Sequence, residues 1–316
     1  MFKARTLPDS AALALGWTRF AVNPHARQTA LAPEPGGRWR CGSNSSVYML
    51  KAMGLQLQFD GLKVLDDISL TIPEGCFTAL IGANGCGKTT LLNVLARMLR
   101  PASGDVLLQG KPHVQLSRRD LARQIALLPQ RTASPAGITV RELVMQGRYP
   151  WQSWWQQWSD ADQQAVDRAV ALADVGKLLD RTLTSLSGGQ LQRCWIAMTL
   201  AQETPVILLD EPTTFLDIAH QIALLELLAE LRDQGRTVVA VLHDLNQAAR
   251  YADQLVMLRQ GKVHAQGTPA EVFTPANLKA VFDLDAHILI DPHSGDPLCV
   301  PASPARIREL DSQVAL

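Results

Sequence analysis

The stretch Phe77–Thr90, which reads FTALIGANGCGKTT, decides the fold of this chain of 316 residues. Its apolar first part, Phe77–Ile81, predicts a short buried strand. The glycine-rich part that follows fits the pattern G-x-x-x-x-G-K-[ST]. Thr89–Leu99 then has the apolar spacing of a helix that ends before Pro101. A strand, a glycine-rich loop and a helix in this order are the setting in which such a loop holds phosphate groups.

The chemistry of this loop depends on its glycines, its lysine and the first residues of the helix. The residues are Gly82, Ala83, Asn84, Gly85, Cys86, Gly87, Lys88, Thr89 and Thr90. Glycines let successive backbone N–H groups turn toward anionic oxygens, and the helix N-terminus adds partial positive charge. We expect Lys88 to reach the β- and γ-phosphates of a nucleotide and Thr89 to offer its hydroxyl to Mg²⁺. An ordinary glycine-rich turn is the alternative.

A second apolar run ends in two carboxylates. Val206–Leu209 predicts a buried strand, and Asp210 and Glu211 follow it directly. A carboxylate delivered at the end of such a strand suits Mg²⁺, so we expect Asp210 to help hold the ion. Glu211 would then lie near the γ-phosphate, where it can polarise an attacking water. The alternative is a strand that ends in a solvated acidic turn, and the presence of the glycine-rich loop disfavours it.

The rest of the chain alternates between strand-like and helix-like patterns. Apolar residues predict strands over 55–59, 68–72, 106–108, 125–128, 237–242, 255–258, 263–265, 287–290 and 298–300. Capping signals and apolar spacing predict helices that begin at Thr139, run from Ser159 to about Ala173, run from Ser187 to about Gln202, and cover Ile218–Arg232. The first three helices are consecutive and predict a helical insertion over about residues 131–202. The fold class is therefore α/β.

Composition excludes several classes of protein. The chain has 30 Lys and Arg against 30 Asp and Glu, so its formal net charge is +0, which disfavours a strongly basic nucleic-acid binder. No apolar run approaches the roughly 18–20 residues that a membrane span needs. The five cysteines lack metal-ligand spacing, and we expect all of them to be reduced thiols.

The two ends of the chain differ from its middle. Residues 1–48 hold several prolines, a Gly-Gly pair and a Ser/Asn cluster without sustained periodicity, which predicts a poorly ordered extension. A start codon assigned too far upstream is the alternative, with Met49 or Met53 as the true start. Residues 302–316 are expected to form a C-terminal tail.

A third motif points to a family. Leu186–Gln190 reads LSGGQ and precedes the Val206–Leu209 strand by about twenty residues. Together with the glycine-rich loop it resembles the signature of ATP-binding cassette (ABC) ATPases, and the resemblance covers residues 49–301. It implies a P-loop NTPase cassette fold with a RecA-like core, an antiparallel β subdomain and a helical subdomain that carries the signature.

The resemblance also implies how the signature works. Its residues Ser187, Gly188, Gly189 and Gln190 open a helix, which makes another anion-binding N-terminus. In the family this motif closes over ATP bound to a partner cassette. A head-to-tail dimer of two copies, with ATP and Mg²⁺ in two composite sites, is therefore implied.

Four more residues match motifs of the family in the expected order. Gln130 matches the Q-loop glutamine, which senses Mg²⁺ and the attacking water. Asp217 matches the D-loop aspartate, which contacts the partner subunit; a helix N-cap is the alternative, and both roles can hold at once. His243 matches the switch histidine that binds the γ-phosphate. Phe59 occupies the place of the aromatic residue that stacks on adenine, and a core-strand Phe is its alternative.

A finer resemblance concerns what is transported. The segments 137–151, 211–221 and 291–298 resemble ATPases of ferric siderophore importers; haem and cobalamin importers share much of this pattern. The resemblance implies transmembrane permease subunits, a periplasmic or lipoprotein substrate-binding protein, and a peripheral location on the cytoplasmic face of the bacterial inner membrane. A soluble ABC ATPase acting on nucleic acid is disfavoured, because the chain has one P-loop, neutral charge and no sustained heptads.

Four of the seven tryptophans lie close together. Trp151, Trp154, Trp155 and Trp158 have the spacing of one face of a helix. Two interpretations stay open at this point: a stripe packed into the core of the helical subdomain, or an exposed patch that receives a cytoplasmic helix of the membrane partner.

Overall fold

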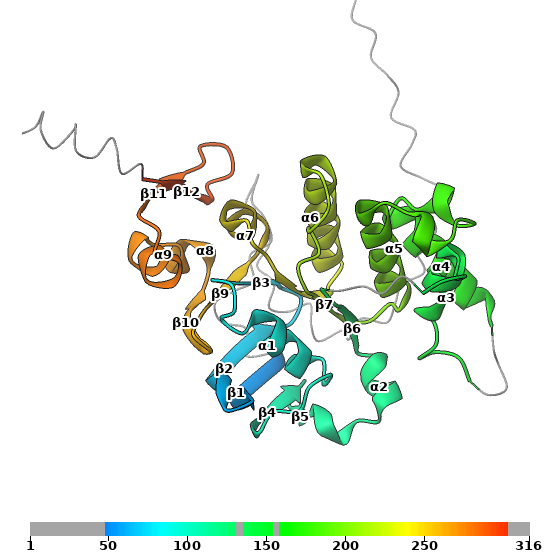
Figure 1. Cartoon of the computed structure of the whole chain (residues 1–316), viewed down its shortest axis with the longest axis horizontal. Helices are drawn as coiled ribbons and strands as arrows, with labels where there is room; N and C mark the ends of the chain where they lie inside the picture. The colour runs from blue at the N-terminus through cyan, green and yellow to red at the C-terminus, as the bar shows by residue number, and fades with distance from the viewer. Residues whose placement is uncertain (1–47, 131–134, 154–157, 303–316) are drawn as a thin grey trace, which may run out of the picture. The chain divides into compact units, whose positions relative to one another are not determined.

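A six-stranded sheet runs through the centre of the computed structural model, which describes residues 48–130, 135–153 and 158–302 (Figure 1). Its strand order is β10-β9-β3-β8-β7-β6, and all neighbours are parallel except β9 and β10. The strands are β3 (Phe77–Gly82), β6 (Ile125–Leu128), β7 (Val206–Leu209), β8 (Thr237–Val241), β9 (Gln254–Arg259) and β10 (Lys262–Gly267). Every residue of β3, β7 and β8 is buried, as expected for parallel strands covered on both faces.

A second, antiparallel sheet has the order β2-β1-β4-β5. Its strands are β1 (Tyr48–Phe59), β2 (Leu62–Pro73), β4 (Ser103–Leu108) and β5 (Lys111–Pro112). Leucines and isoleucines of β1 and β2 form one hydrophobic cluster with helix α1 (Lys88–Leu95) and with one face of the central sheet. Helix α1 and this sheet therefore cover that face, as Figure 1 shows.

Helices cover the other face of the central sheet. On this face, buried side chains of β3, β7 and β8 form a second hydrophobic cluster with α3, α5, α6 and α7; Phe77, Ile207 and Val238 are among them. The helices on this face are α3 (Val140–Gln146), α4 (Asp160–Leu172), α5 (Gly188–Ala201), α6 (Ile218–Asp233) and α7 (Leu245–Tyr251). Helix α2 (Arg118–Ala122) lies on the opposite face, where its Leu121 joins the first cluster. Short 3-10 turns occupy His113–Gln115, Gly176–Leu178 and Leu183–Ser185.

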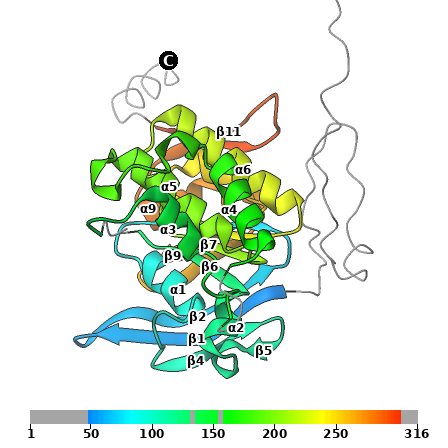
Figure 2. The same ribbon diagram turned by 90° about the vertical axis from the view of Figure 1, so that its right-hand side faces the viewer.

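Helices α3, α4 and α5 pack side by side (Figure 2). Each begins with a capping box in which a hydroxyl residue and an acidic or amide residue three positions later bind each other's backbone N–H. The pairs are Thr139 with Glu142, Ser159 with Asp162, and Ser187 with Gln190. The sequence signals for these three helix starts are thus matched by the structure.

The C-terminal elements adjoin the central sheet. They are α8 (Pro269–Val272), α9 (Pro275–Phe282) and the hairpin β11 (Ala286–Ile290) and β12 (Pro297–Pro301). The hairpin is joined to α7 by the side-chain amide of Asn246, which accepts from Cys299 N at 2.7 Å and donates to Cys299 O at 3.3 Å. None of the described helices is both long and apolar enough to cross a bilayer.

Three sequence-based expectations need correction. The helix predicted to reach Leu99 ends at Leu95, because Arg97 adopts a left-handed conformation (φ 58°) and its guanidinium is bound by carbonyls of the following segment. No helix contains Trp151 or Trp158, and Trp154 and Trp155 lie outside the described residues. Cys76 is disulfide-bonded, so the expectation of reduced thiols is wrong for this residue.

Candidate functional site

The glycine-rich loop connects β3 to α1 at the carboxyl edge of the central sheet. Two of its glycines have no room for a side chain. A Cβ at Gly82 would lie 2.3 Å from the carbonyl oxygen of Leu258, and one at Gly87 would lie 2.8 Å from that of Val64. Both glycines also have positive φ, which side chains disfavour. The loop is therefore held tightly between β9 and β2.

Lys88 lies inside this loop with only 6% of its surface exposed. Its ammonium group donates to Gly82 O at 2.8 Å and to Ala83 O at 3.0 Å. These bonds keep the cation beneath the backbone turn at the N-terminus of α1, where helix geometry already favours an anion. Loop, lysine and helix end together form a positively polarised cradle for phosphate oxygens.

The next residue, Thr89, faces the end of β7. Its hydroxyl donates to the Oδ1 atom of Asp210 at 3.0 Å. Asp210 is 1% exposed, and burial raises the pKa of its carboxyl to about 6, although the hydrogen bond from Thr89 acts in the opposite direction. A hydroxyl and a carboxylate are hard oxygen ligands that suit Mg²⁺, with phosphate and water completing the shell. The described residues contain no cluster of three or more His, Cys, Asp or Glu that could hold a metal.

Glu211 lies beside Asp210 and is held by two polar side chains. His243, which follows β8, places Nε2 2.7 Å from Oε1 of Glu211, and Gln130, which follows β6, makes a further side-chain hydrogen bond to it. Burial acts to raise the pKa of Glu211, but the hydrogen bonds from His243 and Gln130 and the electrostatic attraction of His243 and Lys88 together outweigh it, so the pKa lies below its ordinary value. The backbone of Glu211 is left-handed, with φ 52°, a conformation that costs a non-glycine residue about 1 kcal/mol. An ionised carboxylate is thus fixed beside the loop.

The signature segment forms a separate hollow of about 530 Å³ with the loop that precedes α6. Gly188 and Gly189 lie against Phe215, whose Cβ would be 3.5 Å from a Cβ at Gly188. Asp217 caps α6: its Oδ1 accepts from His220 N at 2.9 Å and lies 2.7 Å from His220 Nδ1. Accepting from the His220 backbone is the main reason that the pKa of Asp217 is lowered.

Among the described residues, no hydrogen bond joins the signature to the glycine-rich loop. Gln190 uses its side-chain oxygen to cap its own helix at Ser187 N, 3.2 Å away. The structure therefore brings Lys88, Thr89 and Asp210 together on one side and leaves the signature hollow open on another.

Comparison with known proteins settles the family. A family model for ABC transporters matches residues 65–214. A probable siderophore transport system ATP-binding protein of Bacillus subtilis is 50% identical over 248 residues, which are 78% of this chain and 90% of that protein. The ferric enterobactin transport ATP-binding protein of Escherichia coli is 49% identical over 257 residues, 81% and 95% of the two chains. The chain belongs to the ABC transporter family. It is an ATPase coupled to transport.

Solved structures of ABC proteins share this fold. An inward-facing conformation of a metal-chelate type ABC transporter aligns with TM-score 0.69 at 29% identity, over 82% of this chain and 99% of that one. A dimeric bacterial ABC transporter cassette aligns with TM-score 0.63 at 26% identity, over 70% and 98%. The cassette fold predicted from the sequence is confirmed, with its parallel core, antiparallel sheet and helical group.

Phe59 lies at the end of β1, next to the turn into β2, and is 46% exposed. Phe59 is the strand partner of Leu62 in the β1–β2 pair. Farther along β2, the carbonyl of Val64 lies against Gly87 of the glycine-rich loop. An exposed ring near the loop is compatible with stacking on a base and does not fit the alternative of a core-strand Phe.

Sequence reasoning missed several residues around the signature hollow of the ABC ATPase. Phe215 is 76% exposed and left-handed (φ 66°), and His220 and Arg193 line the same hollow. His220 could have been found from its position three residues after the expected cap Asp217. Phe215 gave no such signal, because an apolar residue between two turns is usually assigned to the core.

Proposed function

We propose that the chain is the ATP-binding and ATP-hydrolysing subunit of an importer that takes up ferric siderophores across the cytoplasmic membrane. The observation that carries this proposal is the degree of similarity: siderophore and petrobactin relatives are 47–50% identical over 78–81% of the chain. A cobalamin import ATP-binding protein of Halobacterium salinarum is 41% identical over 80% of the chain and makes cobalamin the second candidate.

ATP binding follows from the loop and the residues beside it. We infer that the β- and γ-phosphates lie against the backbone N–H groups of residues 82–90, with Lys88 as their fixed cation. Thr89, Asp210 and Gln130 would hold Mg²⁺, which supplies charge neutralisation at the phosphates when it is bound. Phe59 would stack on the adenine.

Hydrolysis needs a base, a cation and a group that detects the γ-phosphate. The lowered pKa of Glu211 keeps its carboxylate ionised near neutral pH, so it can accept a proton from an attacking water. Lys88 stabilises charge on the transferring phosphoryl group. His243, now bound to Glu211, would exchange that partner for the γ-phosphate and so report its presence.

The second partner is another copy of the chain. We infer a head-to-tail dimer in which Ser187, Gly188, Gly189 and Gln190 of one subunit close over the ATP of the other, with Asp217 at the contact. The open hollow at the signature and the exposed side chains of Phe215 and Ile218 beside it support this arrangement. A related cassette has been solved as a dimer, which supports it further.

The remaining partners follow from the proposed role. We infer one cassette over residues 49–301, with a helical subdomain of about 131–202, preceded by an extension and followed by a tail from residue 302. It would bind transmembrane permease subunits from the cytoplasmic side of the inner membrane and serve a periplasmic or lipoprotein substrate-binding protein. Nucleic acid is not among the partners.

The test combines purification and uptake. The chain is purified from its membranes to identify the permease that accompanies it, and uptake of labelled ferric siderophore is compared in cells with the gene, without it, and with Glu211→Gln. Loss of iron uptake in the last two strains, with cobalamin uptake intact, is the expected result. Loss of cobalamin uptake instead would favour the second candidate, and no loss of either would contradict both.

A further inference from the structure

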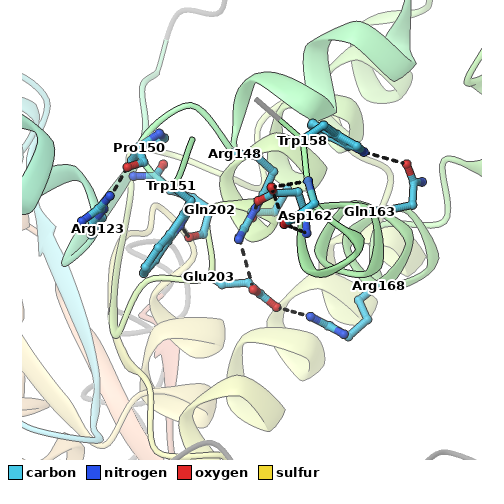
Figure 3. Close-up of polar contacts among 12 residues, drawn as sticks. Arg123, Arg148, Pro150, Trp151, Trp158, Asp162, Gln163, Arg168, Gln202 and Glu203 are labelled. Atoms are coloured by element: carbon cyan, nitrogen blue, oxygen red, sulfur yellow. Dashed lines mark hydrogen bonds and ion pairs between the residues drawn. The ribbon is translucent and has the colours of Figure 1, made fainter. Parts of the chain in front are cut away.

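The turn after α3 is bound to the C-terminal end of the signature helix α5 (Figure 3). Nη1 of Arg148 donates to Ala201 O at 2.8 Å, and Nε1 of Trp151 donates to Gln202 O at 2.7 Å. Carbonyls at the end of a helix have no partner within the helix, so these two side chains satisfy them. A guanidinium at this end also complements the helix dipole.

Arg148 joins three helices at once. Its Nε is 2.9 Å from Asp162 of α4, and its Nη1 is 3.2 Å from Glu203, which also binds Arg168 at 2.6 Å. The side chains of Arg148 and Asp162 are 6% and 8% exposed, so this ion pair is shielded from solvent. Asp162 closes the capping box of α4 with Ser159 at the same time. Each of the two carboxylates, Asp162 and Glu203, is thus paired with an arginine, as a carboxylate with little exposure to solvent requires.

Gly147, which ends α3, brings the two helices into direct backbone contact. A Cβ at this position would lie 2.3 Å from Met198 O and 3.1 Å from the Cβ of Ala201. Its φ of −57° is ordinary for any residue. Glycine is therefore needed here only for the close approach of α3 to the last turn of α5.

The same turn is bound to the α2 side of the molecule. Pro150 O accepts from Nε of Arg119 at 2.9 Å and from Nε of Arg123 at 2.8 Å, and both arginines belong to α2 or its cap. The guanidinium groups of Arg123 and Arg148 each lie 5.4 Å from the centroid of the Trp151 ring, within cation–π distance. Helix α2 leads directly into β6 of the central sheet.

We propose that the Gly147–Trp151 turn, here named the α3–α5 joint, is a positioning element that fixes the signature helix against α2. It thereby sets where Ser187, at the opposite end of α5, meets the ATP of a second subunit. This inference rests on the head-to-tail dimer of the proposed function. Helix α5 has 14 residues and is about 21 Å long. A tilt of about 5° at the joint would move Ser187 by about 2 Å, which is more than a hydrogen bond tolerates.

The experiment measures ATP-dependent dimerisation in the Glu211→Gln background by sedimentation. Trp151→Phe keeps the ring and removes the N–H donor, and Gly147→Ala forces α3 away from α5. Arg141→Gln is the matched control, since it breaks an exposed ion pair of α3 with Asp180 without touching α5. We expect dimerisation about fivefold weaker or more in both joint variants and unchanged in the control, because a displaced Ser187 would lose about one hydrogen bond to the ATP of the second subunit. ATP affinity of the monomer should stay the same in all three.

Equal dimerisation in the joint variants and the control would overturn the inference. Failure of the Glu211→Gln parent itself to dimerise with ATP would count against the proposed dimer instead. The joint is then tested in the monomer with spin labels at Arg118→Cys of α2 and Thr184→Cys before the signature. Trp151→Phe should shift or broaden the distance distribution between the labels, and an unchanged distribution would refute the positioning role.

Discussion

Replacing Asp210 with Asn is expected to stabilise the nucleotide-free protein while weakening its response to Mg–ATP. The carboxyl group is almost completely buried, and its pKa is raised from 3.8 to about 6. A pKa shift of about two units corresponds to about 3 kcal/mol. This is the amount by which an ionised Asp210, compared with a neutral one, lowers the free energy of unfolding. Asn has the same shape and can still accept the hydrogen bond from Thr89, but it carries no charge.

The pH dependence fixes the sign of this effect. The folded protein binds the Asp210 proton more tightly than the unfolded chain does. The stabilisation from that proton is complete below pH 3.8 and is lost as the pH rises through about 6. The stability advantage of Asp210→Asn over the native protein should therefore grow by about 1.4 kcal/mol between pH 5 and pH 7.5.

Urea unfolding in EDTA at pH 5 and pH 7.5 measures this difference, with Asp180→Asn as control because the Asp180 side chain is 89% exposed. The control should differ little from the native protein at either pH. Adding Mg–ATP should raise the midpoint of the native protein by more than that of Asp210→Asn, which lacks one of the residues proposed to hold Mg²⁺. A stability difference that does not vary with pH would refute the assignment of a buried, raised-pKa carboxyl at this position.

Three further substitutions test other parts of the account. Glu211→Gln should retain ATP binding and lower the turnover number at least about 100-fold, since it removes the base; turnover within threefold of the native rate would exclude that role. Arg232→Met should lower the free energy of unfolding, measured with urea, by about 3–5 kcal/mol, because the buried Asp253 carboxylate loses the guanidinium that lies 2.8 Å away and keeps only the hydrogen bond from Phe77 N. A loss below about 1 kcal/mol would argue against a strong buried pair. Gly82→Ala should weaken ATP binding in titrations more than about tenfold, because its Cβ would meet Leu258 O at 2.3 Å, and native affinity would show that the loop can yield.

Much of the site could be predicted because its parts follow buried parallel strands. Gln130, Glu211 and His243 are far apart in the sequence, yet each follows a strand whose carboxyl end lies at the same edge of the sheet. Strands such as β7 and β8 are continuous apolar runs, which the sequence displays directly. The meeting of these three side chains was therefore implied by the α/β pattern and the family motifs.

Local patterns failed where tertiary contacts decide the backbone. The tryptophan spacing predicted a helix, but Trp151 lies in a turn fixed by the end of α5, and Ser159 begins a new helix at α4. The early end of α1 depends on distant carbonyls that bind Arg97. Short elements such as α8, which has four residues, are too brief for any periodicity to show.

The α3–α5 joint also lay outside the reach of sequence reasoning. Gly147 has an ordinary φ, so no turn signal marks it, and its importance comes only from the nearness of Met198. An arginine is expected on the surface when only the sequence is known. The burial of Arg148 depends on its ion pairs with Asp162 and Glu203, which only the folded structure shows.

Transport driven by ATP is the central claim, and one measurement tests it most directly. The chain and the permease that copurifies with it are reconstituted in vesicles with the substrate-binding protein, and accumulation of labelled ferric siderophore is followed with Mg–ATP on the side of the ATPase. We predict accumulation with the native chain and none with Glu211→Gln. Equal accumulation with both proteins, or accumulation without ATP, would contradict the account.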